Sequence, residues 1–176
     1  MRIAIVGAGS VGSALGFGWM QAGHDVVFAV RDAGSRSAQT AAARGGRLVA
    51  PDDTADAEVF VTCPLGLTVL ADEIRLQQML GNLLSNAVKY GEPPIRLVAL
   101  ASTGRVEFRV VDSGPGVSDE FRPLLFQPFA RAAGRSNGGT GLGLSVVRAL
   151  AESHGGTAWY EDAPGSSSFC FALPSR

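Results

Sequence analysis

The chain has 176 residues, 46% of them hydrophobic, and carries 15 lysine and arginine residues against 16 aspartate and glutamate residues. This composition excludes an intrinsically disordered chain and allows one substantial core, or one core with an appendage. The formal net charge of -1 gives no electrostatic footprint for nucleic acid.

The chain begins with the strand, glycine turn, helix and strand of a dinucleotide-binding unit. Residues 1–6 predict a short apolar strand, and Gly7, Gly9 and Gly12 follow with the spacing G-x-G-x-x-G ahead of a helical stretch. A second apolar strand covers residues 25–30. In such a unit the glycines permit the tight turn, the approach of a pyrophosphate and the packing of the helix.

This segment resembles the start of NADP-dependent oxidoreductases, notably the coenzyme F420-dependent group. Arg31 and Asp32 follow the second strand. An acid here would accept from a ribose 2'-hydroxyl, whereas neighbouring arginines favour a 2'-phosphate, so the mixture favours NADP over NAD, with Arg31 near the phosphate. The unit lacks a second mononucleotide half and a substrate domain, so hydride transfer is not supported. The alternative is a strand-helix-strand appendage whose glycines bind nothing.

The junction that follows is ambiguous. Residues 35–46 predict a short helix that ends at a glycine pair. Residues 57–64 could be the fourth strand of the dinucleotide fold or the first strand of the next domain, and we expect them to join only one of two sheets. We place the boundary here, with a partial Rossmann-like segment over residues 1–56 and a second domain over residues 57–176.

Two features bear on location and redox state. Residues 3–23 are uncharged and long enough to span a bilayer, but their glycines fall on the nucleotide-turn spacing, so we expect a cytoplasmic protein without a membrane segment here. Cys63 and Cys170 lie in apolar strand-like runs, so we expect buried free thiols.

Residues 74–90 predict an amphipathic helix, because apolar residues recur at helical spacing. Asn82 and Asn86 lie four apart and project from one face of it. Mg2+ prefers one or two protein oxygens together with substrate phosphates, which two neutral amides beside a triphosphate supply. Lys89 adds a point charge toward phosphate oxygens.

Residues 96–101 and 104–111 predict neighbouring antiparallel strands, and Asp112 ends the second. A carboxylate only accepts hydrogen bonds, so Asp112 can take the exocyclic amino proton of adenine. Gly114 and Gly116 then permit a tight turn and close approach of a base.

Two further segments complete the pattern. Phe126 and Phe129 lie three apart, as core residues or as anchors of the following loop. Residues 138–145 form a glycine-rich turn that opens another helix, and backbone N–H groups at such a place bind anions. The expected phosphate contacts in this turn are Gly139, Thr140, Gly141, Leu142 and Gly143. The chain then predicts a helix stop at residues 152–156 and a terminal hairpin from residues 157–161 and 168–174.

Together, residues 82–90, 112–116, 126–129 and 138–144 resemble the N, G1, F and G2 boxes of the ATP-binding domain of sensor histidine kinases. This superfamily also includes gyrase, Hsp90 and MutL. The resemblance implies a Bergerat-type α/β sandwich, with a mixed sheet covered by helices on one face, that binds Mg-ATP. It also implies that Tyr90 belongs to the site and that residues 130–137 form an ATP lid, in which Arg131 and Arg135 contact phosphates or remain solvated.

The resemblance further implies a two-component system in which a partner dimerisation domain supplies the phosphoacceptor histidine and a response regulator receives the phosphoryl group. The chain contains only His24 and His154, neither in a phosphoacceptor context, so autophosphorylation in the ordinary way is doubtful. Two alternatives remain open: an NADP-binding oxidoreductase fragment, and a non-catalytic nucleotide-sensing module.

Overall fold

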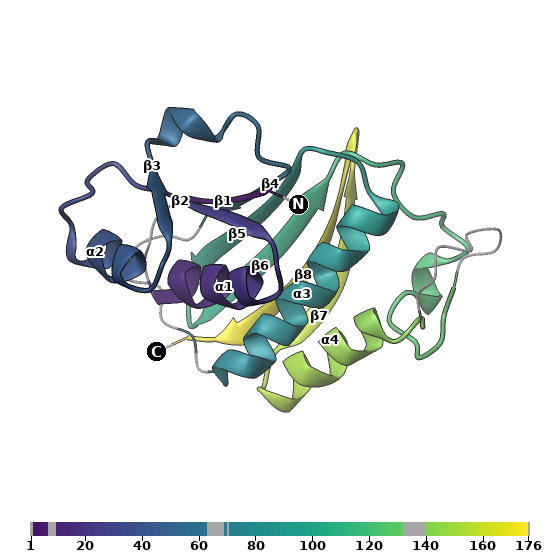
Figure 1. Cartoon of the computed structure of the whole chain (residues 1–176). Helices are drawn as coiled ribbons and strands as arrows, with labels where there is room; N and C mark the ends of the chain where they lie inside the picture. The colour runs from purple at the N-terminus through teal and green to yellow at the C-terminus, as the bar shows by residue number, and fades with distance from the viewer. Residues whose placement is uncertain (1, 7–9, 63–68, 70, 132–139, 176) are drawn as a thin grey trace.

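The computed structural model describes residues 2–6, 10–62, 69, 71–131 and 140–175. The elements are β1 (Arg2–Val6), α1 (Ser10–Gln21), β2 (Asp25–Ala29), α2 (Arg36–Ala43), β3 (Arg47–Val49), η1 (Pro51–Thr54), β4 (Val59–Thr62), α3 (Glu73–Tyr90), β5 (Ile95–Ser102), β6 (Arg105–Asp112), η2 (Arg122–Leu124), α4 (Gly143–Ser153), β7 (Thr157–Ala163) and β8 (Ser166–Pro174). The strands form one mixed sheet in the order β3-β2-β1-β4-β5-β6-β8-β7. Helices α1, α3 and α4 lie on one face of it (Figure 1), which confirms the predicted fold class.

The N-terminal part has the strand arrangement of a dinucleotide fold. Strand β1 pairs in parallel with β2 on one side and β4 on the other, and β3 extends the sheet beyond β2. The predicted strand-helix-strand order is confirmed. Within the uncharged run of residues 3–23, the described residues belong to β1, to α1 and to the turn that follows α1. Among the helices described, none combines the length and apolar character needed to cross a bilayer.

The C-terminal part is largely antiparallel. Strands β5 and β6 form the predicted hairpin through Gly104, whose φ of 70° suits the turn, and β7 and β8 form the predicted terminal hairpin. Helix α3 begins at its cap Asp72, whose carboxylate accepts from the Arg75 N–H at 3.0 Å. Helix α4 stops at the predicted glycine, since Gly155 has a φ of 73°.

The two parts share one sheet. Strand β4 pairs in parallel with β1 and also with β5, so Val59 lies between Ile3 and Ile95. The expectation that this strand joins only one of two sheets is therefore wrong. The physical reason is that α3 connects β4 to the parallel strand β5, so β4 can pair with β1 on one side and with β5 on the other.

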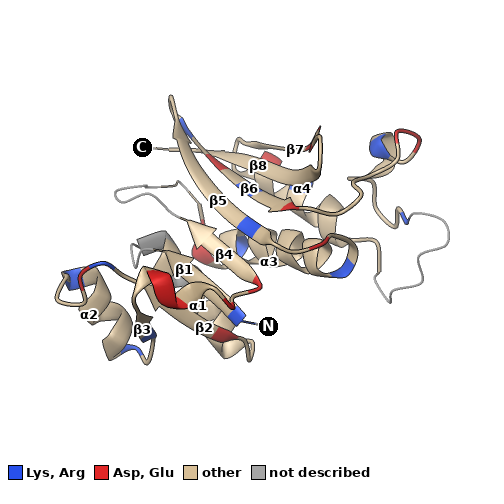
Figure 2. Cartoon of the chain, turned by 90° about the horizontal axis from the view of Figure 1, so that it is seen from above, with Lys and Arg blue, Asp and Glu red and all other residues tan. Residues whose placement is uncertain are grey.

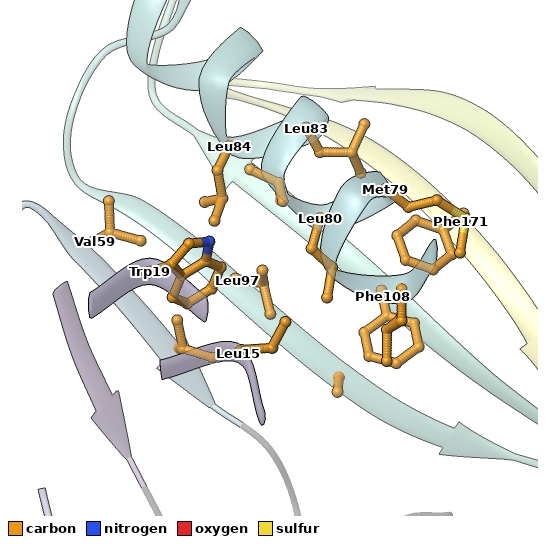
Figure 3. Packing of buried hydrophobic residues seen from close by; sticks show 14 of the residues in the cluster. Leu15, Trp19, Val59, Met79, Leu80, Leu83, Leu84, Leu97, Phe108 and Phe171 are labelled. Atoms are coloured by element: carbon orange, nitrogen blue, oxygen red, sulfur yellow. The ribbon is translucent and has the colours of Figure 1, made fainter. Parts of the chain in front are cut away.

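The buried apolar side chains of the described residues form one cluster that includes residues of both parts of the chain (Figure 3). Leu15 and Trp19 of α1 face Leu80 and Leu84 of α3, over Leu97 of β5. Farther along the sheet, the rings of the paired residues Phe108 and Phe171 stack with centroids 4.9 Å apart. Because apolar burial is the main stabilising term in folding, the two parts of the chain stabilise each other.

The opposite face carries polar side chains. Alternation along β6 places Arg109 away from the core, where its guanidinium pairs with Glu107 at 2.9 Å and Glu161 at 2.6 Å. The hydrogen bond that Arg109 donates to the Glu107 carboxylate raises the pKa of Arg109. Cys170 is free and buried, as predicted, and burial raises the pKa of its thiol to about 12. Cys63 lies outside the described residues. Charges of both signs are interspersed over the chain (Figure 2).

Shortening Trp19 to alanine should lower the free energy of unfolding of the whole chain by about 3–5 kcal/mol, because it opens a cavity between α1 and α3. The variant keeps one tryptophan, Trp159 on β7, as a fluorescent reporter in the C-terminal part. In chemical denaturation, fluorescence and circular dichroism should shift to the same lower midpoint. An unchanged Trp159 midpoint would contradict the shared core.

The matched control for this variant is Ile74→Ala. Ile74 lies on α3 but is 71% exposed. Its truncation should change the free energy of unfolding by about 0.5 kcal/mol or less, as is usual for surface substitutions.

Candidate functional site

A cavity of about 570 Å³ opens between α3, the start of α4, the ends of β6 and β8, and residues 116–118. Its volume falls in the range of roughly 300–1,000 Å³ that is typical of small-molecule sites. Of the residues singled out from the sequence, those that line it are Asn82, Asn86, Lys89, Tyr90, Asp112, Gly116, Arg131, Thr140, Gly141, Leu142 and Gly143. Four segments far apart in the sequence therefore meet at one cavity.

Helix α3 supplies one wall. Its apolar residues, including Leu83 and Leu84, are buried against the sheet, which turns Asn82, Asn86 and Lys89 toward the cavity. Gly143, the first residue of α4, faces this wall, since a Cβ built on it would lie 3.7 Å from Cγ of Asn82. The amide pair and the glycine-rich turn thus lie directly opposite each other.

Asp112 lies at the floor and is 3% exposed. Its Oδ1 accepts from the Gly114 N–H at 2.9 Å, and its Oδ2 accepts from the Ser167 hydroxyl at 3.1 Å. The backbone of Gly91 approaches so closely that an added Cβ would lie 2.5 Å from Cγ of Asp112. The carboxylate is therefore fixed by neutral donors and close backbone, and it stays an acceptor toward the cavity.

The two phenylalanines differ in their surroundings. Phe126 is buried, and the Arg148 guanidinium lies 4.5 Å from the centroid of its ring. Phe129 is 72% exposed and has a φ of 63°, while its N–H donates to the Gly141 carbonyl at 2.9 Å. Core packing is thus confirmed for Phe126, whereas Phe129 contributes its backbone to a closed junction with the glycine-rich turn.

The beginning of α4 offers backbone donors. Leu142 and Gly143 line the cavity, and no side chain among the described residues caps this helix N-terminus. The first N–H groups of a helix lack partners within the helix, and the helix dipole adds positive potential there. This end of the cavity is suited to an anion.

The remaining predicted residues lie elsewhere. Gly114, Phe126 and Phe129 are not among the residues that line the cavity. Gly12 is buried in α1 and Arg31 is exposed beyond β2, so both belong to the N-terminal part. Gly7, Gly9 and Gly139 lie outside the described residues, as does most of the segment predicted to form the lid.

Several lining residues were not predicted. Gln78 and Ser85 lie on α3 one turn from Asn82, and helical spacing alone could have identified them. Ser167 and Phe169 lie on β8, and they reach the cavity because Asp112 pairs with Ser167 across the sheet. That register carries no local sequence signal.

The donor set can be tested against a magnesium ion. The described residues contain no cluster of three or more His, Cys, Asp or Glu side chains that could hold a metal by themselves. The two amide oxygens of Asn82 and Asn86 match instead the sparse protein ligation of Mg2+, which takes its other ligands from phosphates and water. The residues present fit a metal that arrives with a nucleotide.

Comparison with known proteins divides the chain in two. Residues 71–176 match the family described as histidine kinase-, DNA gyrase B- and HSP90-like ATPase, and residues 2–68 match the family of coenzyme F420-dependent NADP oxidoreductases. The chain is 44% identical over 102 residues to the sensor histidine kinase YkoH of Bacillus subtilis, an alignment that covers 56% of this chain and 22% of YkoH.

Two other proteins extend the similarity. The sensor histidine kinase component HK1 of Mycobacterium tuberculosis is 36% identical over 121 residues, which are 68% of this chain and 72% of HK1. A crystal structure of full-length ShkA in complex with AMPPNP matches with a TM-score of 0.56 and 39% identity, over 66% of this chain and 25% of ShkA. The first curated relatives are much longer, and the chain spans only 22% to 32% of their length.

Replacing Gly91 with alanine should destabilise the protein by about 1–3 kcal/mol, because the new Cβ would lie 2.5 Å from the Asp112 carboxyl and 2.7 Å from the Ala87 carbonyl oxygen. Gly81→Ala on α3 is the matched control. A Cβ at Gly81 would have no neighbour within 4 Å, so the higher helix propensity of alanine should raise the free energy of unfolding by about 0.5–1 kcal/mol. Thermal and denaturant unfolding measure the change in stability of each variant. If Gly91→Ala and Gly81→Ala change the stability equally, the close packing at Asp112 is contradicted.

Proposed function

Because the chain belongs to the histidine kinase-, DNA gyrase B- and HSP90-like ATPase family, we propose that its cavity binds Mg-ATP and presents the γ-phosphate to a histidine on a partner domain. The observation that carries the proposal is the meeting of Asn82, Asn86, Asp112 and the start of α4 at one cavity. A histidine-kinase-type ATP-binding catalytic domain therefore makes up the larger part of the chain.

In this proposal Asp112 recognises the adenine ring. Its carboxylate accepts the exocyclic amino hydrogen, whereas guanine presents a carbonyl oxygen at that position and is rejected. The donors Gly114 and Ser167 orient the carboxylate. Apolar contacts to the base come from Phe169 and Val117, which line the same cavity.

The phosphates are proposed to lie between α3 and α4. Backbone N–H groups at Gly141, Leu142 and Gly143, together with Thr140 and, beyond the described residues, Gly139, would bind phosphate oxygens. Lys89 and Arg131 add positive charge, and Tyr90 borders the same region. Mg2+, when bound, neutralises charge on the phosphates, and Asn82 and Asn86 would orient it through their amide oxygens.

The phosphoacceptor is proposed to come from a partner dimerisation domain, with a response regulator downstream. Phosphoryl transfer requires donor and acceptor in line, so the acceptor has to approach the cavity. His154 ends α4, and its Nδ1 lies 2.8 Å from the Leu150 carbonyl oxygen, a helix-end contact. His24 precedes β2 in the N-terminal part.

A second candidate activity is dinucleotide binding by the N-terminal part. The match of residues 2–68 to coenzyme F420-dependent NADP oxidoreductases favours it, as does the strand order β3-β2-β1-β4. We propose NADP as the ligand, with Arg31 near its 2'-phosphate and Gly7, Gly9 and Gly12 at the pyrophosphate. A non-catalytic nucleotide-sensing role remains the alternative in which ATP binds without transfer.

Mg-ADP should raise the melting temperature of the wild-type chain, because a ligand at 100 times its Kd adds about 2.7 kcal/mol to the stability of the folded state. Asp112→Asn keeps the shape of the side chain but replaces one acceptor oxygen with a donor, so it should remove most of this shift. Differential scanning fluorimetry measures it, and GDP serves as the nucleotide control. A full shift in the variant would refute the adenine assignment.

The same titration has a metal arm and a protein control. Chelation of Mg2+ should reduce the wild-type shift, while Asn86→Ala should show the reduced shift with or without the metal. Asp25→Asn, an exposed acid that pairs with Arg47 far from the cavity, should respond like the wild type. Loss of the response in Asp25→Asn would point to general destabilisation instead.

NADPH should raise the melting temperature independently of ADP, and Arg31→Ala should lose the preference for NADPH over NADH, because the arginine favours the 2'-phosphate. Thermal shift measured with each dinucleotide, in the presence and absence of Mg-ADP, checks this. Absence of any shift with NADPH would leave the N-terminal part as a structural segment only.

A further inference from the structure

Three side chains close a hydrogen-bonded ring around one residue of the cavity wall. The N–H of Val117 donates to the Tyr160 hydroxyl at 3.1 Å, and that hydroxyl donates to Oδ1 of Asp162 at 3.1 Å. The other Asp162 oxygen accepts from the Arg122 guanidinium, whose Nε donates back to the Val117 carbonyl at 3.0 Å. Both backbone polar groups of Val117 are thus held by side chains.

The ring is attached to the rigid part of the fold. Tyr160 and Asp162 lie on β7, which pairs along its length with β8, and the Tyr160 ring packs 5.0 Å from Phe169. Arg122 is also tied to Asp119 at 2.9 Å, and its guanidinium lies 5.6 Å from the centroid of the Tyr160 ring. The segment that carries Val117 is therefore fixed to the sheet by side chains that do not themselves line the cavity.

Tyr160 and Asp162 also lie against Gly116, which lines the cavity that contains Asp112. Gly116 has a φ of 70°, and a Cβ there would lie 2.9 Å from both the Tyr160 hydroxyl and the Asp162 carboxylate, so glycine is required by conformation and by space. Burial raises the pKa of Tyr160, against smaller lowering influences from Val117 and Ser167, so the phenol keeps the proton that it donates. Ser167 in turn donates to Asp112.

We infer that Tyr160, Asp162 and Arg122 are positioning residues for the adenine part of the nucleotide site, acting through Val117 and Gly116. The inference rests on the proposed function and goes beyond it, because none of the three side chains lines the cavity. They hold the wall in its binding shape before the nucleotide arrives, which reduces the ordering that binding requires. The phosphate end, on the far side at α4, is independent of them.

Isothermal titration of the whole chain with adenosine and with Mg-ADP tests this inference. Tyr160→Phe removes the acceptor for the Val117 N–H and keeps the aromatic side chain. Asp162→Asn removes the negative charge that pairs with Arg122 and leaves one acceptor oxygen for the two donors, Tyr160 and Arg122. Each variant should lower the affinity for both ligands by the same factor, about three- to tenfold for the loss of one hydrogen bond. The ratio of the two affinities should therefore stay unchanged.

The matched control is Glu161→Gln. Glu161 neighbours both ring residues on β7 but points to the other face of the sheet, where it pairs with Arg109, and its side chain is as exposed as that of Asp162. It should bind both ligands as the wild type does. Circular dichroism at the titration temperature confirms folding, and if Tyr160→Phe does not fold, Asp162→Asn decides.

The outcomes separate this inference from the proposed function. A wild-type chain that binds neither ligand overturns both. If the wild-type chain binds both ligands and a folded Tyr160→Phe or Asp162→Asn variant binds them with the same affinity, the positioning role alone is overturned. A variant with lower affinity for Mg-ADP but unchanged affinity for adenosine also overturns the positioning role, because the three side chains would then act on the phosphate end.

Discussion

The burial of one apolar stripe of α3 is the interaction on which the rest of the structure depends. Leu80, Leu83 and Leu84 are fully or almost fully buried against the sheet. Most of the stability of a helix within a protein comes from packing of its apolar face, so this burial both stabilises α3 and fixes its rotation about its axis. Since Asn82 and Asn86 lie on the opposite side of the helix, the same packing determines that the amide pair faces the cavity.

The part of the structure that was predictable follows local periodicity. Apolar residues at helical spacing predicted α3 and α4, alternation predicted the hairpin of β5 and β6, and both are confirmed. Local sequence also placed residues of three of the four boxes on elements that converge at the cavity. Ser167 and the ring around Val117 were not predictable, because they depend on which residues face each other across β6, β7 and β8.

The shared strand β4 escaped prediction for a related reason. The composition of residues 57–64 predicts a strand, but it does not indicate how many partner strands this strand has. Because β4 pairs with both β1 and β5, the edge of β5 is covered. Without β4, β5 would be an unpaired edge strand of the ATPase part, and unpaired edges are prone to aggregation. The N-terminal part therefore has a structural role in this domain whether or not it binds a dinucleotide.

The two halves of the cavity are held by different means. At the floor, Asp112 is held by neutral donors and by the close backbone of Gly91 and Gly114, so its position does not depend on a charged partner. At the wall, the backbone of Val117 is held by an exposed, partly ionic ring of side chains. Ion pairs of that exposure weaken with added salt, whereas close packing does not. The shape of the wall is therefore more sensitive to ionic strength than the position of the carboxylate.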